Sequence, residues 1–115
     1  MLSTLSDITP FINSFVHESE KILGQNLSKV ILYGSYARGE QRENSDIDLM
    51  ILTSLNNDDE IRKVEKALYD VAFEYEMEHL INISVIVNNE KHFYDWVNDL
   101  PFYRNVEQEG VVLVA

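Results

Sequence analysis

Several residue types that would define a function are scarce or absent in this chain. Cysteine is missing, which excludes disulfides, thiolate nucleophiles and cysteine-type zinc sites and suits a reducing cytoplasm. Only four glycines and two prolines occur, so collagen-like and low-complexity classes are excluded. No apolar run approaches the roughly 20 residues of a membrane-spanning helix. Because no base precedes Lys21, we expect neither a signal peptide nor a membrane segment.

Basic residues are also in short supply. Nine lysines and arginines face 20 aspartates and glutamates, which gives a formal net charge of −11. Nucleic-acid affinity comes largely from basic side chains that neutralise phosphates, so we expect no direct nucleic-acid binding and a basic protein as partner instead. The length of 115 residues fits one domain over residues 1–115 and excludes a two-domain enzyme. We expect a cytoplasmic protein.

The hydrophobic patterns alternate between helical and strand periods. Thr9 can cap a first helix with Pro10 at its first position. The polar segment 39–45 is expected to be a surface loop. These patterns predict an α/β domain whose small sheet has helices packed against it. The predicted helices cover residues 10–23, 57–78, 88–97 and 102–108, and the predicted strands cover residues 27–33, 46–53, 80–87 and 111–114.

Two short motifs, ten residues apart, carry the chemistry. Gly34 and Ser35 end the first predicted strand and lead into a helical turn, where unpaired N–H groups and a hydroxyl can bind phosphate. Asp46 and Asp48 lie two positions apart on the next strand, so both side chains leave the same face, with Cα atoms about 6.6 Å apart. Two carboxylates in this arrangement favour one or two Mg²⁺ ions, whose remaining ligands are waters and substrate phosphates.

A family resemblance rests on these motifs and their surroundings. Gly34-Ser35, followed after ten residues by Asp46-x-Asp48 and Leu-Met-Ile, resembles the signature of the polymerase-β-type nucleotidyltransferase superfamily. The segment Tyr33–Glu40 together with Ser45–Leu49, in so short a chain, is similar to the minimal nucleotidyltransferase (MNT) family. The resemblance implies a nucleotidyltransferase fold with a small mixed β-sheet, Mg²⁺ as cofactor, and ATP or another NTP as donor.

The same resemblance implies residue roles and a partner. Asp46 and Asp48 would hold the metal, and Gly34 and Ser35 would hold the β- and γ-phosphates. Proteins of this family are commonly encoded beside an all-helical HEPN toxin and act as its antitoxin, in studied cases by attaching AMP to a toxin tyrosine. The resemblance therefore implies a HEPN-type toxin as partner, with an oligomer formed with that partner as a further expectation.

The third predicted strand departs from the family pattern. The superfamily usually has a third carboxylate there, which helps to hold the metal and takes the proton from the attacking hydroxyl. Residues 81–87 contain no acid. We predict Asn82 at that position, with Ser84 as the alternative on the same face. An asparagine cannot accept the proton, and a positioned base is worth about 10²–10⁴-fold, so slow catalysis or none is in view. Glu76 and Glu78 close the preceding helix and are expected to be solvated.

The remaining polar and aromatic residues give weaker signals. Arg38 is assigned to phosphate binding, with pairing to Glu40 or Glu43 as the open alternative. Three scattered histidines lack the spacing of a metal site, namely His17, His79 and His92. Five aromatic residues within eleven positions are too many for one buried stripe, so half should be core and the rest an anchoring patch: Phe93, Tyr94, Trp96, Phe102 and Tyr103.

Two function classes follow. The first is an enzyme that transfers AMP from Mg-bound ATP to a protein hydroxyl, with Asp46 and Asp48 as catalytic metal ligands and Asn82 in place of the base. The second is an antitoxin that neutralises its toxin by binding alone, with a catalytically weak or inactive nucleotide site. The retained aspartates favour the enzyme, and the acid-free third strand favours binding alone.

Overall fold

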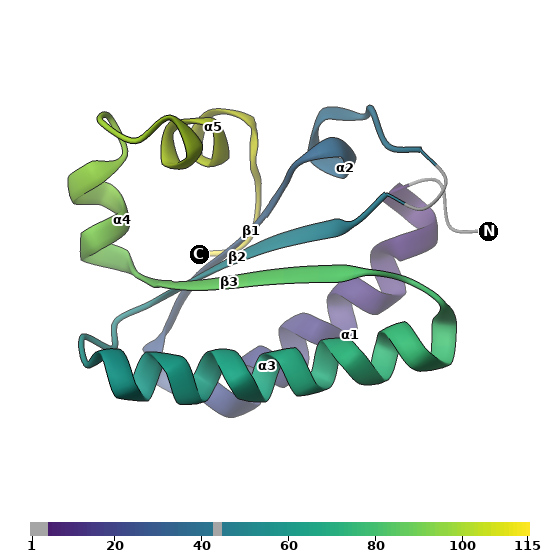
Figure 1. The fold of residues 1–115 in the computed structure, drawn as a ribbon, viewed down its shortest axis with the longest axis horizontal. Coiled ribbons are helices and arrows are strands. Elements are labelled where there is room, and N and C mark those ends of the chain that lie inside the picture. Colours follow the sequence, from purple (N-terminus) through teal and green to yellow (C-terminus); the bar gives the residue numbers. More distant parts are fainter. Residues whose placement is uncertain (1–4, 43–44) are drawn as a thin grey trace.

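Four strands form one mixed sheet in the computed structural model, which describes residues 5–42 and 45–115 (Figure 1). The strands are β1 (Leu27–Tyr33), β2 (Ile47–Thr53), β3 (Ile83–Asn89) and β4 (Val111–Val114). The helices are α1 (Leu5–Leu23), the 3-10 turn η1 (Gly24–Asn26), α2 (Ser35–Arg38), α3 (Asp58–His79), α4 (Glu90–Trp96) and α5 (Pro101–Glu109). The predicted α/β class, a small mixed sheet with packed helices, is confirmed.

The strand order β3-β2-β1-β4 brings three strand ends to one end of the sheet. β1 pairs antiparallel with β2 and β4, whereas β2 and β3 are parallel. A tight hairpin cannot join parallel strands, so the chain crosses from β2 to β3 through α3. In this register Tyr33 lies opposite Asp48, and Asp48 lies opposite Ser84. The end of β1 and the starts of β2 and β3 therefore meet.

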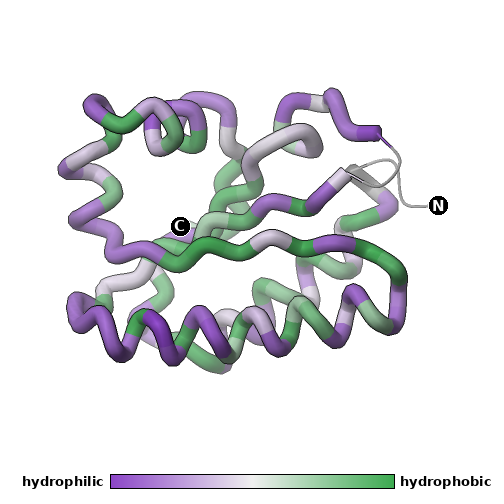
Figure 2. The backbone as a smooth tube through the Cα atoms, in the orientation of Figure 1, coloured by the Kyte–Doolittle hydropathy of each residue, from purple (hydrophilic) through white to green (hydrophobic). Residues whose placement is uncertain are grey.

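Helices cover both faces of the sheet, with α1 and α3 on one side and α4 and α5 on the other (Figure 1). Because side chains alternate along a strand, Leu49 and Ile51 pack in the α1 and α3 layer, and Met50 and Leu52 pack in the opposite layer. All four are fully buried. Figure 2 shows hydrophobic colours along the strands, as two-sided burial requires. Asp48 thus extends the face of Met50 at the polar end of a buried strand.

The first helix begins earlier than the sequence predicts. We expected Thr9 as its cap and Pro10 as its first residue, but α1 begins at Leu5 and contains Pro10. Packing stabilises the additional turn, because Ile8 is fully buried in the core together with Ile12, one turn later. A proline near the start of a helix removes few backbone hydrogen bonds, so it does not have to mark the first residue.

The third strand begins later than predicted. Leu80 ends α3 in the left-handed conformation, with φ 55°, and its N–H donates to the Glu76 carbonyl at 3.0 Å. Its side chain is 91% exposed, so this apolar residue takes no part in the strand. The prediction of a strand from residue 80 is therefore wrong at its start, because the hydrophobic run continues through a helix cap. Asn82 precedes β3 instead of lying within it.

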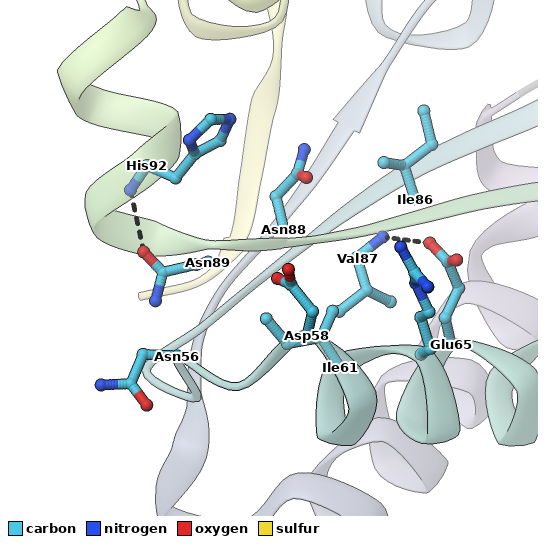
Figure 3. A pocket seen from close by; sticks show the side chains of 10 residues that line it. Asn56, Asp58, Ile61, Glu65, Ile86, Val87, Asn88, Asn89 and His92 are labelled. Carbon is cyan, nitrogen blue, oxygen red and sulfur yellow. Dashed lines mark hydrogen bonds between the residues drawn. The ribbon is translucent and has the colours of Figure 1, made fainter.

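The other predicted segments are confirmed to within two residues. Asn57 caps α3, with a side-chain oxygen that accepts the Glu60 N–H at 3.1 Å. Asn89 caps α4 and accepts the His92 N–H at 2.8 Å (Figure 3). Residues 43 and 44 of the predicted loop, and residues 1–4 of the segment considered for a signal peptide, lie outside the described residues. Within the described part of the chain, no helix is both long enough and apolar enough to cross a membrane.

β3 is an edge strand, and α3 supplies two carboxylates to its outer N–H groups. Glu76 Oε1 accepts the Ile83 N–H at 3.2 Å, and Glu65 Oε2 accepts the Val87 N–H at 3.1 Å (Figure 3). These hydrogen bonds cover part of the exposed edge. They also hold α3 antiparallel to β3, so the C-terminal half of α3 lies beside the start of β3.

Candidate active site

Gly34 joins β1 to α2 and lies directly against Asp48. Its backbone has φ 78° and ψ −156°, a region that is essentially restricted to glycine. A Cβ atom at this position would overlap Asp48 Oδ2. The missing side chain therefore lets the Asp48 carboxylate approach the backbone. The antiparallel pairing of β1 with β2 thus brings the two sequence motifs together.

The two aspartates differ in their surroundings. Asp46 is exposed just before β2, whereas Asp48 is half-buried within it. Burial, together with the negative charge of Asp46, raises the pKa of Asp48 to about 6, while the Arg38 guanidinium acts in the opposite direction. A bound cation would offset the energetic cost of the lost hydration at Asp48 and would reduce the repulsion between the two carboxylates. The electrostatics of the two aspartates therefore favour the binding of a cation.

A test of stability against pH follows from the raised pKa of Asp48. The unfolded chain loses this proton near pH 4 but the folded chain keeps it to about pH 6, so folding stability falls as pH rises through that window. Replacing Asp48 by Asn removes the penalty. In the presence of a chelator, urea unfolding should show the variant about 1 kcal/mol more stable than wild type at pH 8, after allowance for solvent screening, and equally stable at pH 3.5.

The control for this test is the exposed Asp59. Asp59→Asn should change the free energy of unfolding by a small amount that is the same at pH 6 and at pH 8, because this carboxylate lies in the first turn of α3 and away from the site. A stability difference between wild type and Asp48→Asn that stays constant from pH 3.5 to pH 8 would contradict the raised pKa.

Ser35 begins α2, which is a single turn of four residues. The Gly34 carbonyl accepts the Arg38 N–H at 3.1 Å, and the Ser35 carbonyl accepts the Glu40 N–H at 2.9 Å. A turn this short contributes little macrodipole, so any phosphate contact depends on the backbone N–H groups at its start and the Ser35 hydroxyl. The assignment of Gly34 and Ser35 to phosphate binding stays a prediction, and the dipole of this short helix does not support it.

Arg38 lies beside the aspartates but is engaged by carboxylates. Its guanidinium donates to Glu40 Oε2 and to Glu109 Oε2, each at 3.4 Å. Both partners raise the pKa of Arg38 further. The pairing with Glu40 that was left open is therefore observed, whereas the role in phosphate binding stays a prediction. The contact with Glu109 joins residues 71 positions apart and has no signal in the sequence.

Asn82 and Ser84 lie on the same side as the aspartates. The Asn82 carbonyl accepts the Ile47 N–H at 2.8 Å, which places Asn82 beside the start of β2. Ser84 is the register partner of Asp48, and partners in a parallel pair point to the same face. Asp46, Asn82 and Ser84 line one depression of about 400 Å³. The structure thus brings both candidate positions to the aspartate pair.

Glu76 corrects an expectation. We expected it to be solvated at the end of its helix, but it is half-buried, accepts the Ile83 N–H and lines the same depression as Asp46. Its carboxylate serves the β3 backbone because α3 docks along that strand. Glu78 is exposed, as expected. Among the described residues, no three histidine, aspartate or glutamate side chains form a group that could hold a metal ion.

Aromatic residues line the other side of the site. Tyr33, the register partner of Asp48, packs edge-on against Phe102 with ring centroids 5.5 Å apart. Burial and the Asp48 charge raise the pKa of Tyr33 to about 12. These rings and Arg38 line a cavity of about 200 Å³ next to Gly34. Tyr33 and Phe102 were not predicted as site residues, although Tyr33 directly precedes the glycine motif.

The prediction that about half of the five C-terminal aromatic side chains pack in the core, and that the rest are exposed, is confirmed. Phe93 is fully buried, and Tyr94 and Tyr103 pack partly buried against the same cluster. Trp96 and Phe102 are 47% and 43% exposed. Whether they anchor a partner stays a prediction.

The residues at this site fit a magnesium-bound triphosphate. Gly34 leaves a cradle that a Cβ would fill, and the two aspartates supply hard oxygen ligands in an electrostatically unfavourable pair. With two carboxylates, waters and phosphate oxygens would have to complete an octahedral shell. The donor set therefore suits Mg²⁺ brought with a nucleotide better than a metal held by protein alone.

A second depression, of about 510 Å³, lies at the opposite end of β3 (Figure 3). It opens between the N-terminal parts of α3 and α4 and contains none of the predicted site residues. Two of its polar side chains are engaged in the fold, since Glu65 binds the Val87 N–H and Asn89 caps α4. It therefore serves as a reference region away from the aspartates.

Comparisons with known proteins show the family of this chain. The family model described as "Nucleotidyltransferase domain" matches residues 16–113. The Methanocaldococcus jannaschii protein named "Putative protein adenylyltransferase MJ0604" is 35% identical over 102 residues, which cover 89% of this chain and 93% of that protein. Its relative from the same organism, "Putative protein adenylyltransferase MJ0141", is 30% identical over 97 residues, covering 84% and 95%.

Solved structures show the same fold. The chain superimposes with a TM-score of 0.54 and 19% identity on a structure described as "Crystal structure of the toxin-antitoxin with AMP-PNP", over 89% of this chain and 72% of that one. The chain therefore belongs to the nucleotidyltransferase domain family. The resemblance inferred from its Gly-Ser and Asp-x-Asp motifs is confirmed.

Proposed function

We propose that this chain is an antitoxin that transfers AMP from Mg-bound ATP to a hydroxyl of a HEPN-type toxin. The observation that carries the proposal is the contact of Asp48 with the Gly34 backbone, with Asp46 beside it. Support comes from relatives named as protein adenylyltransferases and from the similar fold of a toxin–antitoxin bound to AMP-PNP. Residues 1–115 would act as one minimal domain in the cytoplasm.

Each part of the site has a role in this reaction. Asp46 and Asp48 would hold Mg²⁺, and the N–H groups of Gly34 and Ser35 with the Ser35 hydroxyl would hold the β- and γ-phosphates. When bound, the metal stabilises negative charge on the phosphates and on the departing pyrophosphate. Arg38 would exchange a carboxylate partner for a phosphate oxygen, which its exposed guanidinium permits.

The reaction forms one bond and breaks one. The acceptor hydroxyl oxygen bonds to the α-phosphorus, the bond from that phosphorus to the bridging oxygen breaks, and pyrophosphate leaves. The hydroxyl proton must leave as well. No carboxylate lies on β3, so water would take the proton, and we expect a slow enzyme.

A second function, neutralisation by binding alone, is favoured by one observation. Within the described residues, no third acid joins Asp46 and Asp48 in a group that could hold a metal ion. Such a site could keep nucleotide affinity while its catalysis is weak. The toxin would then be silenced by occlusion.

The test of the proposed function uses purified protein, Mg²⁺, the proposed HEPN-type partner protein, and ATP labelled at the α-phosphate. We expect label to remain on the partner protein after denaturation. ATP labelled at the γ-phosphate should leave no label, because pyrophosphate departs. A partner that stays unlabelled from α-labelled ATP, while the γ-label is also absent, would contradict nucleotidyl transfer.

Asn82 provides a gain-of-function prediction. Asn82→Asp places a carboxylate in the depression with Asp46 at nearly unchanged volume, so AMP transfer should accelerate about tenfold or more, within the ~10²–10⁴-fold range of a positioned base. Initial rates of label transfer measure the effect. The matched control is Asn88→Asp, on the same strand at its other end, which should leave the rate unchanged. Equal acceleration by both variants would contradict a positional effect.

A further inference from the structure

A second apolar stripe runs along the outer side of α3. Ten large hydrophobic side chains are exposed in the described part of the chain, and four of them lie on this helix or its cap. Tyr69, Phe73, Met77 and Leu80 are 49%, 59%, 66% and 91% exposed. Their spacing of four, four and three residues places them on one helical face. We call these four residues the outer stripe.

The outer stripe is not needed to bury α3 in the fold. The opposite face of the helix already packs into the core through Leu68 and Ala72, both buried, with further contacts from Val64, Val71 and Tyr75. A helix with one core-facing stripe normally presents polar residues elsewhere. A contiguous exposed apolar row on the other side indicates an interaction surface.

The outer stripe adjoins the active site. The bond from Ile83 N–H to Glu76 fixes the C-terminal half of α3 beside the start of β3. Tyr69, the first residue of the stripe, lines the depression that also contains Asp46 and Asn82. A partner seated along the stripe would therefore cover one side of this depression. Its hydroxyl groups would be held within reach of the aspartates.

The charges around the stripe select the kind of partner. Residues 69–80 contain four carboxylates and no lysine or arginine. Asp70 and Glu78 are both largely exposed, with side chains at 72% and 69%. A second copy of this chain would bring another four carboxylates to the same contact and would carry its own charge of −11. Like charges at this density oppose self-association, whereas a basic surface is attracted.

We propose that the outer stripe is the docking surface for the acceptor protein, a polypeptide whose contact face is apolar at its centre and basic at its rim. The inference rests on the proposed function in naming the occupant as the AMP acceptor. Docking along α3 presents the acceptor hydroxyl to the depression beside Asp46. This surface is separate from the patch around Trp96, which lies on α4.

The test measures binding and transfer with the proposed HEPN-type partner protein as the probe. The variant Phe73→Ala with Met77→Ala keeps good helix formers in α3, so the fold should be retained. We expect its affinity for the probe to fall about 100-fold or more, because central apolar anchors dominate interfaces. The thermal shift with Mg²⁺ and ATP should be unchanged, since neither side chain lines the depression.

The matched control is Ile22→Ala with Val112→Ala, two side chains that are 37% and 50% exposed on α1 and β4. This control should bind the probe within about twofold of wild type. Loss of binding in the control but not in the stripe variant would overturn the proposal. So would sedimentation showing that wild type self-associates through the stripe and that Phe73→Ala with Met77→Ala is monomeric.

The charged rim is tested separately. Glu74→Lys with Glu78→Lys reverses two exposed charges, and association with the probe should slow about tenfold at low salt. An unchanged or faster association rate would overturn the basic rim. If wild type binds through the stripe but transfers no AMP, the docking surface stands and the nucleotidyltransferase proposal fails, so the two failures are distinguishable.

Discussion

Exchanging Asp46 and Asp48 together for asparagine is expected to remove the stabilisation that Mg²⁺ and ATP give the wild-type protein. A ligand at a hundred times its Kd stabilises a fold by about 2.7 kcal/mol, which is roughly 10 °C in Tm for a domain of this size. Asparagine keeps the side-chain volume but lowers the ligand charge by two. The double variant should therefore melt cooperatively with no ligand shift, and its AMP transfer should fall at least ~100-fold.

A charge-matched control separates ligand binding from a general charge effect. Asp59→Asn with Asp99→Asn removes the same two charges from exposed positions away from the site. Thermal melts with and without Mg²⁺ and ATP should show the full wild-type shift for this control. If the Asp46 and Asp48 double variant kept the same shift as wild type, the metal site would lie elsewhere.

Among substitutions that add a single methyl group at the site, Gly34→Ala is expected to be the most damaging. The alanine would have to adopt a backbone region restricted to glycine, and its Cβ would overlap the Asp48 carboxylate. Strain of this kind and displacement of Asp48 together should cost about 3 kcal/mol or more of stability. The Mg²⁺ and ATP shift should also be lost, because Asp48 could no longer lie against the backbone.

Gly39 offers a control with strain but no overlap. It also has positive φ, at 70°, yet a Cβ there would meet nothing within 4 Å. Gly39→Ala should cost only about 1 kcal/mol and keep the ligand shift. Urea unfolding and thermal melts of the two variants measure both effects. Equal losses in the two glycine variants would contradict the close approach of Asp48 to Gly34.

The hydrophobic patterns of strands and helices predicted most of the fold, because burial on one or both faces of an element imposes a period that is visible in the sequence. The period of two also predicted Asp46 and Asp48 on one face; the register of β2 includes Asp48 but begins after Asp46, so the shared face stays a prediction. The predicted ends of elements were wrong where a local sequence rule conflicted with packing in the folded chain. Pro10 is inside α1 because Ile8 is buried, and Leu80 is a helix cap although it begins a hydrophobic run.

Contacts between distant segments could not be predicted from the sequence. Arg38 and Glu109 lie 71 residues apart, and Glu76 reaches the β3 backbone only because α3 docks along that strand. No local period encodes such docking. The outer stripe was missed for a related reason, since the inward stripe of α3 already explains an amphipathic helix. Only exposure in the folded chain distinguishes Phe73 and Met77 from core residues.

The proposed function requires that this chain modifies its partner chemically. Intact mass spectrometry of the HEPN-type protein, co-expressed with either wild type or the Asp46→Asn, Asp48→Asn variant, tests it most directly. The account predicts a partner heavier by the mass of AMP only with wild type. An unmodified partner that is silenced equally by both forms would contradict the account and would leave neutralisation by binding alone.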